Sequence, residues 1–282
     1  MSSTGHQTRQ NLKQSTVTPL APPPYATVSS APTLSSLPVS DDELAGLRGY
    51  DVVYIVDDSS SMSWEESVSK IIPWPHARDA LITFSTLCAQ WDEDGQDVYF
   101  LNRNEPVLNA TPQQIAEVFN LTLPNGGTNM GARLAKIARA YFEEYDAGEV
   151  KPMNIIAITD GQFSDDVISV IKWIVVQLDK RDALPNQIGI QFVQIGADRA
   201  ATKCLQMLDD DLEDMGLSRD IVDTVPWSPR KVDGPGFDGK YLIKVVCGAI
   251  NKKIDNQGRR KKGTKGTEKP QKKKSMLRRM FS

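Results

Sequence analysis

The chain has 282 residues, of which 40% are hydrophobic and 24% are charged, a composition typical of a folded protein with polar ends. No apolar run approaches the roughly 18 residues that a membrane-spanning helix needs, and the first residues lack the apolar stretch of a secretory signal. The net charge of −3 hides an asymmetry: residues 251–282 carry thirteen Lys and Arg against two acids, whereas residues 49–250 carry 17 bases against 31 acids, a net charge of −14. We therefore expect an acidic body with a basic C-terminal segment.

The first segment of the chain, residues 1–47, is rich in Ser, Thr and Pro and shows no apolar periodicity. Such a segment cannot bury enough surface to offset its ordering entropy, so we predict a disordered arm. Within it, Pro22, Pro23 and Tyr25 match the Pro-Pro-x-Tyr pattern that WW domains bind as a polyproline II strand, with the tyrosine as anchor. The same residues also fit a plain Pro-rich linker, and the sequence leaves both readings open.

Residues 48–254 alternate between strand and helix patterns. The apolar, β-branched runs predict strands at 50–57, 97–102, 153–160, 188–196 and 220–226. Helical spacing of apolar residues predicts helices near 77–91, 130–141, 167–178, 199–212 and 240–254, and a capping box at Thr111–Gln114 predicts the start of a further short helix. This alternation indicates one α/β domain of the Rossmann-like, doubly wound kind, with a mostly parallel central sheet and helices on both faces. In such sheets ligands bind at the carboxyl ends of the strands.

The last segment, residues 255–282, is basic, poor in apolar residues and predicted to be disordered. Its bases fit a nuclear localisation signal or a sequence-independent contact with RNA or DNA. Its end interleaves bases with Met276, Leu277, Met280 and Phe281, a pattern that also suits an anionic membrane surface. A merely solubilising tail is a fourth reading.

The three cysteines, Cys88, Cys204 and Cys247, lie far apart within apolar patterns. An odd count without a secretory signal predicts reduced thiols in a reducing compartment. We therefore expect the protein in the cytoplasm or the nucleus.

Side chains with oxygen donors gather at two predicted strand ends and in one glycine-rich loop. Asp57 ends the first strand and is followed by Ser59 and Ser61, while Asp160 ends the strand 153–160. Thr128 follows two glycines and directly precedes a helix. If the sheet is parallel, these segments meet at one edge. Two carboxylates, three hydroxyls and water then form an all-oxygen shell that suits Mg²⁺ or Mn²⁺, with Ca²⁺ as a further option.

These motifs resemble the metal-ion-dependent adhesion site of von Willebrand factor type A domains, whose pattern is D-x-S-x-S, a distant Thr and an Asp in a TDG turn. Asp57, Ser59, Ser61, Thr128 and Asp160 match all five positions in the family order, and the resemblance covers residues 49–254. It implies direct metal bonds from the two serines, a direct or water-mediated bond from the threonine, and mostly water-mediated bonds from the aspartates. The acidic body is similar to the intracellular versions of the family that are frequent in fungi.

The resemblance implies a protein–protein interaction module rather than an enzyme, in which the metal bridges to an Asp or Glu of a protein partner. One alternative is an adaptor that works through its Pro-Pro-x-Tyr arm and basic tail, with the folded domain as a passive scaffold. A less favoured alternative is a Mg²⁺-dependent phosphoester hydrolase that uses Asp57 or Asp58 beside the metal. It is disfavoured because no Lys or Arg accompanies these loops to hold a phosphate.

Overall fold

The computed structural model describes residues 47–89, 91–92, 95–148, 150–214, 217–226 and 239–250. The predicted WW-ligand residues Pro22, Pro23 and Tyr25 and the basic segment 255–282 lie outside these ranges, so both readings stay predictions. None of the helices in the described part of the chain combines the length and the apolarity that a bilayer crossing requires.

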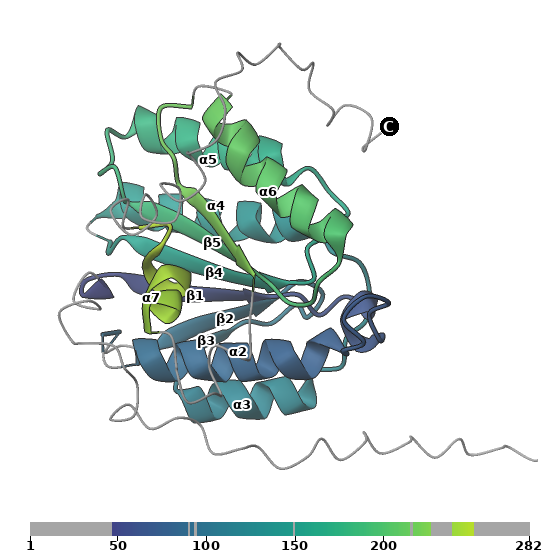
Figure 1. Ribbon diagram of the computed structural model, residues 1–282. Coiled ribbons are helices and arrows are strands. Elements are labelled where there is room, and N and C mark those ends of the chain that lie inside the picture. Colours follow the sequence, from purple (N-terminus) through teal and green to yellow (C-terminus); the bar gives the residue numbers. More distant parts are fainter. Residues whose placement is uncertain are drawn as a thin grey trace, which may run out of the picture.

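Six strands form one sheet in the order β3-β2-β1-β4-β5-β6 (Figure 1). They are β1 (Asp51–Val56), β2 (Gln96–Phe100), β3 (Val107–Ala110), β4 (Met153–Thr159), β5 (Ile188–Gln194) and β6 (Val222–Pro226). Every neighbouring pair is parallel except β2 and β3, which are antiparallel. This confirms the predicted doubly wound, mostly parallel α/β class. The strand β3 at the sheet edge was not predicted from the sequence.

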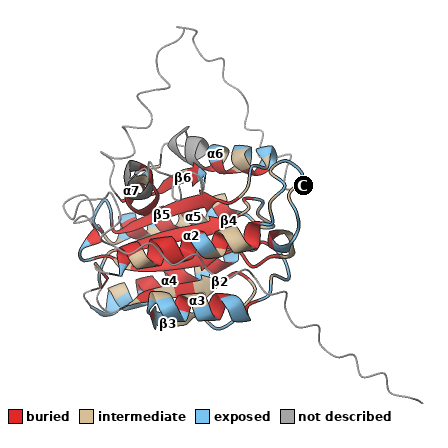
Figure 2. Ribbon diagram, turned by 60° about the horizontal axis from the view of Figure 1, so that its bottom comes forward, coloured by how far each residue is buried: buried red, intermediate tan, exposed pale blue. Residues whose placement is uncertain are grey.

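Helices cover both faces of the sheet (Figure 1). On one face lie α2 (Pro73–Cys88), α3 (Pro112–Leu121) and α7 (Gly239–Cys247), and on the other α4 (Met130–Ala147), α5 (Val167–Lys180) and α6 (Arg199–Asp214). A short 3₁₀ helix, η3 (Ser60–Ser63), follows β1. Figure 2 shows the buried residues concentrated in the sheet and the helix faces that cover it. Because β4 and β5 are covered on both faces, every residue of these two strands is buried.

The helix boundaries follow local signals, and α2 corrects the sequence prediction at both of its ends. The predicted capping box is present at α3, where Thr111 Oγ1 accepts from Gln114 N at 3.3 Å and Thr111 N donates to Gln114 Oε1 at 2.9 Å. The helix α2 begins at Pro73, four residues earlier than the apolar spacing indicated, because proline is favoured in the first turn. It ends at Cys88, so Trp91 lies beyond it.

The first turn of α5 is held by Asp166, whose side chain accepts from Ser169 N at 2.9 Å. The hydrogen bonds from Ser169 lower the pKa of Asp166 below its ordinary value. We expect Asp166→Ala to lower the free energy of unfolding by about 1 kcal/mol at neutral pH. Because the native pKa is depressed, this stabilisation is present above the ordinary aspartate pKa and is lost as the pH falls through the lower native pKa.

Urea unfolding of the wild type and the variant between neutral pH and about pH 3 measures this difference. The control is Asp166→Asn, which keeps the acceptor oxygen and should retain most of the stability. An equal loss in both variants would show that the charge rather than the cap carries the effect.

Candidate metal centre

Asp57 is fixed between the ends of two adjacent strands. It follows β1 directly and is fully buried. Its Oδ1 accepts from Ser59 N at 2.9 Å, and its Oδ2 accepts from the hydroxyl of Thr159, the last residue of β4, at 2.7 Å. Burial raises the pKa of Asp57 to about 6 and the charge of Asp160 adds to this rise, while the hydrogen bonds from Ser59 and Thr159 oppose it.

Ser59, Ser61 and Asp160 form a connected group beside Asp57. The two serine hydroxyl oxygens are 3.0 Å apart. The hydroxyl of Ser61 hydrogen-bonds the carboxylate of Asp160, which follows β4. The Oδ1 atom of Asp160 is buried and has no hydrogen-bond partner in the structure. Four of the five predicted ligands are therefore brought together by the ends of β1 and β4.

The fifth predicted ligand, Thr128, lies in a loop that is bonded to both of these strand ends. Ser60 N donates to Gly126 O, and Gly126 N donates to Ser60 Oγ, each at 3.1 Å. On the other side, Thr128 N donates to the Ser164 hydroxyl at 3.1 Å, and Ser164 N donates to Thr128 O at 2.9 Å. The loop thus places the buried Thr128 between the segments that follow β1 and β4.

Gly126 is needed for the approach of this loop. Its φ of 98° lies in the left-handed region, and a Cβ atom there would come within 2.4 Å of Asn102 Oδ1. The glycine therefore lets the loop approach Asn102 closely, and Asn102 Nδ2 donates to Gly127 O at 2.9 Å.

Asp58 has a different role from its neighbour Asp57. Its Oδ1 accepts from Asn102 N at 2.7 Å and from Asn102 Nδ2 at 3.1 Å, and its Oδ2 accepts from Arg103 N at 3.1 Å. Its backbone oxygen accepts from Asn125 N at 2.7 Å. Asp58 therefore ties the segment after β2 to the two site loops. Sequence reasoning missed Asn102, although its position as the last residue of the predicted strand 97–102 was an available signal.

Two further carboxylates, Glu66 and Asp198, lie outside this group. Burial raises the pKa of Asp160, and the charges of Asp198 and Glu66 add to the rise. Both outer side chains are anchored on the segment after β5: Ala197 N donates to Glu66 at 2.9 Å, and Ala201 N donates to Asp198 Oδ1 at 2.7 Å. The edge is therefore acidic beyond the buried Asp57 and the partly buried Asp160, which favours a cation.

The residues present fit a hard divalent cation. Within the described ranges no group of three or more His, Cys, Asp or Glu is placed to hold a metal, so any site at this edge depends on hydroxyl ligands as well. The arrangement supplies two carboxylates and two serine hydroxyls, with Thr128 in the adjoining loop. An all-oxygen set of this kind suits Mg²⁺, Mn²⁺ or Ca²⁺ rather than a soft metal. The buried, unpartnered Asp160 Oδ1 is the atom that such an ion would satisfy.

No protein-family model matches the chain, and no curated protein matches it in sequence. Among solved structures, it is similar to the SpRpn10 VWA domain, with 15% identity, a TM-score of 0.41, and coverage of 70% of this chain and 93% of that one. A von Willebrand factor type A protein from Catenulispora acidiphila has 15% identity and a TM-score of 0.42, covering 71% and 43%. The manganese-loaded TRAP protein of Plasmodium vivax has 15% identity and a TM-score of 0.41, covering 68% and 74%. The likeness concerns the fold alone.

Proposed function

We propose that this chain is a protein-interaction module that binds Mg²⁺ or Mn²⁺ at the carboxyl edge of its sheet and holds a carboxylate of a protein partner there. The ion would be held by Asp57, Ser59, Ser61, Thr128 and Asp160. When bound, it supplies a positive charge that lets an acidic body accept an acidic side chain. The observation that carries the proposal is the buried Asp160 Oδ1 atom, which has no hydrogen-bond partner. The carboxylate of Asp57 lies close enough for the two negative charges to interact, and a cation would relieve this repulsion.

The distribution of exposed apolar side chains supports a protein partner. Eight large hydrophobic residues of the described chain are exposed, and five of them lie in or beside the two loops of the site: Trp64, Val68, Ile72, Leu121 and Leu123. These loops are joined by the hydrogen bonds between Ser60 and Gly126. Exposed apolar side chains in and beside the loops of a polar site offer surface that a protein partner can cover.

The bonding of Asp58 argues against the hydrolase alternative. A hydrolytic Asp58 would need a carboxylate oxygen aimed at a water or a phosphate beside the metal. Both of its oxygens instead accept backbone hydrogen bonds from the segment after β2. The adaptor alternative depends on residues 1–47 and 255–282, outside the described ranges, and stays a prediction.

Metal binding is tested first with Mn²⁺ alone, by following the loss of the free-ion electron paramagnetic resonance signal on adding the full-length chain. We expect one bound ion per chain. Asp160→Ala should weaken the affinity by about 10- to 100-fold, the usual cost of losing a carboxylate that supports the ion. The control Glu117→Ala removes an exposed carboxylate on α3 and should leave the affinity unchanged.

Partner binding is tested with the same three proteins as bait, in Mg²⁺ and in EDTA. Partners that bridge through the ion should be lost both in EDTA and with Asp160→Ala, and should be retained with Glu117→Ala. Replacing Asp and Glu residues of a captured partner one at a time should then identify one carboxylate on which binding depends. If the captured partners were unchanged both in EDTA and with Asp160→Ala, the metal-bridge proposal would be wrong.

A further inference from the structure

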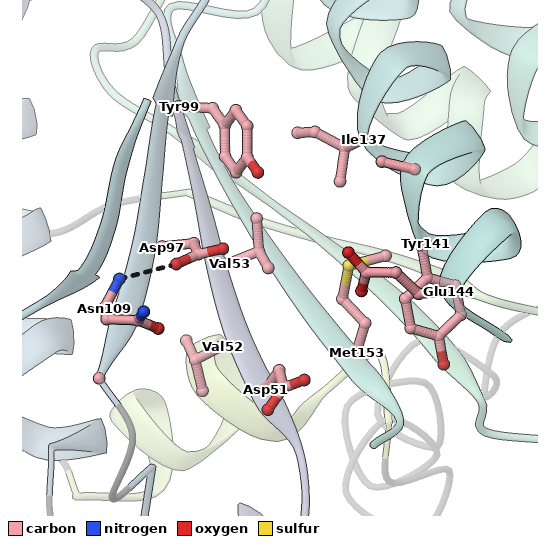
Figure 3. Close-up of a pocket in the computed structure, with 12 residues that line it drawn as sticks. Asp51, Val52, Val53, Asp97, Tyr99, Asn109, Ile137, Tyr141, Glu144 and Met153 are labelled. Carbon is pink, nitrogen blue, oxygen red and sulfur yellow. Dashed lines mark hydrogen bonds between the residues drawn. The ribbon is translucent and has the colours of Figure 1, made fainter. Parts of the chain in front are cut away.

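A separate cavity of about 160 Å³ lies on the α4 face of the sheet. It is lined by Asp51 and Met153, the first residues of β1 and β4, so it lies toward the amino ends of the strands, at the opposite edge from the candidate metal centre. Figure 3 shows side chains of the strands facing side chains of α4 across it: Val53, Asp97 and Tyr99 against Ile137, Tyr141 and Glu144.

The charge of this cavity is negative. Asp51, Asp97 and Glu144 all line it. Lys151 Nζ lies 3.2 Å from Asp51 Oδ1, so these four side chains together carry a net charge of −2. Burial raises the pKa of Tyr99, the charges of Asp97 and Glu144 add to this rise, and the charge of Arg133 opposes it.

The walls of the cavity suit the stem of a long basic side chain. Val53, Ile137 and Met153 give it an apolar lining, and each carboxylate lies near an aromatic ring, Asp97 below Tyr99 on the strand side and Glu144 beside Tyr141 on the helix side (Figure 3). A cavity of roughly 150 Å³ holds a benzene molecule, so this one has room for the aliphatic part of a lysine or arginine. Its charged head would then meet Asp97 and Glu144 and the face of an aromatic ring.

The chain itself carries a segment of complementary charge that starts nearby. Residues 251–282 hold thirteen bases against two acids. The last described residue, Ile250, packs over Gly189 at the start of β5, next to the start of β4 where Met153 lines the cavity. Ile250 lies on the α7 face of the sheet and the cavity on the α4 face, so the segment has to pass around the edge formed by the strand starts. By random-coil scaling about 20 residues span roughly 25 Å, which covers strands about 5 Å apart and the crossing from one face of the sheet to the other. The segment can therefore reach the cavity, and being on the same chain raises its effective concentration to about the millimolar range.

We infer that the cavity between β1, β2 and α4 binds a Lys or Arg side chain from residues 251–282 of the same chain. The inference does not depend on the proposed metal centre. A base held in this way is withdrawn from other acidic ligands, so a membrane surface or a nucleic acid would have to compete with the body of the protein for the segment.

A zero-length carbodiimide cross-linker tests this on the full-length chain, because it joins only carboxylates and amines that are in contact. In the monomer fraction, the lysines of 252–274 should couple to Asp97 or Glu144 at least about five times more often than to Glu143, an exposed neighbour on α4. Coupling of Lys151 to Asp51, already 3.2 Å apart, is the internal positive control.

The variant Ala140→Trp fills the mouth of the cavity from an exposed helix position and changes no charge. It should reduce the cross-links to Asp97 and Glu144 by about tenfold and leave the Lys151–Asp51 cross-link unchanged, which also reports that the fold is intact. Three results would overturn the inference: cross-links spread over the acidic residues in proportion to their exposure, cross-links confined to dimers, or cross-links that persist in Ala140→Trp.

Discussion

Replacing Gly248 by alanine is expected to lower the free energy of unfolding by about 3 kcal/mol, at the upper end of the usual cost of overpacking. A Cβ atom at this position would lie 2.2 Å from Asp223 Oδ2, 2.5 Å from Gln191 Oε1 and 2.5 Å from Lys244 O. Neither side chain has an easy way to move, because both are buried and sit opposite each other in the β5–β6 pair. The added methyl group must therefore displace the end of α7 from the sheet.

Urea unfolding of the full-length protein measures this loss. The matched control is Gly148→Ala, because a Cβ at Gly148 meets no atom within 4 Å and its φ of 166° is extended backbone that alanine adopts. It should stay within about 0.5 kcal/mol of the wild type. If Gly248→Ala were equally mild, the close contact of α7 with β5 and β6 would be wrong.

The polar residues between α7 and the sheet make contacts that the apolar pattern of the sequence does not predict. Asn154 and Gln191 interrupt apolar runs in β4 and β5, yet both are fully buried. Asn154 Nδ2 donates to Val246 O at 2.8 Å, and Lys244 Nζ lies 3.6 Å from Asp223 Oδ1. The first contact joins α7 to a strand 92 residues away and the second joins it to the preceding strand β6, and apolar periodicity carries no information on such polar pairs.

Most helices and strands were predictable because their buried residues form apolar runs or helically spaced apolar positions in the sequence. β4 and β5 are continuous apolar stretches, and the capping box at Thr111 marked the start of α3. The strand β3 was missed because it has four residues, of which Leu108 and Asn109 are exposed. Asn109 also has a positive φ of 51°, and the register of β3 with β2 is irregular. So short and irregular an edge strand shows no alternation of apolar and polar residues from which it could be predicted.

At the candidate site, the sequence indicated the residues that follow the strands but not those that hold them. Asp57 and Asp160 were recognisable as polar side chains at the ends of buried strands. The partner of Asp58, Asn102, is 44 residues away, and the contact of Glu66 with Ala197 N spans 131 residues. Such pairs depend on which strand ends become neighbours, and that follows only from the sheet order.

Saturation with Mn²⁺ or Mg²⁺ is expected to raise the free energy of unfolding by about 2.7 kcal/mol when the free ion is about 100 times its dissociation constant. For a domain of this size, that corresponds to a rise in Tm of about 5–10 °C. The reason is that the site exists only when the ends of β1 and β4 and the loop of Thr128 are assembled. The measurement is calorimetric melting of the full-length chain in EDTA and with each ion.

Two aspartate variants separate metal binding from ordinary stability. In EDTA, Asp160→Asn should raise the stability by about 1 kcal/mol, because it removes one of two neighbouring like charges. At the same ion concentration, an affinity loss of about 10- to 100-fold should cut the metal-induced rise to about 0.4–1.4 kcal/mol. Asp58→Asn should behave in the opposite way. It places an amide where Asn102 and Arg103 require an acceptor, so it should cost about 1–3 kcal/mol in every condition and leave the metal-induced rise intact.

Asp57 and Asp58 are adjacent and both buried, but their hydrogen-bond partners differ. Asp57 accepts from Ser59 and Thr159 at the proposed metal site, whereas Asp58 accepts from the segment after β2. If Asp160→Asn kept the metal-induced rise, the ion would bind elsewhere, and the buried carboxylates would be a purely structural pair. If Asp58→Asn removed it, the segment after β2 would be part of the metal site rather than its support. The ion is assigned to the group formed by Asp57, Ser59, Ser61 and Asp160 only if Asp160→Asn reduces the metal-induced rise and Asp58→Asn leaves it intact.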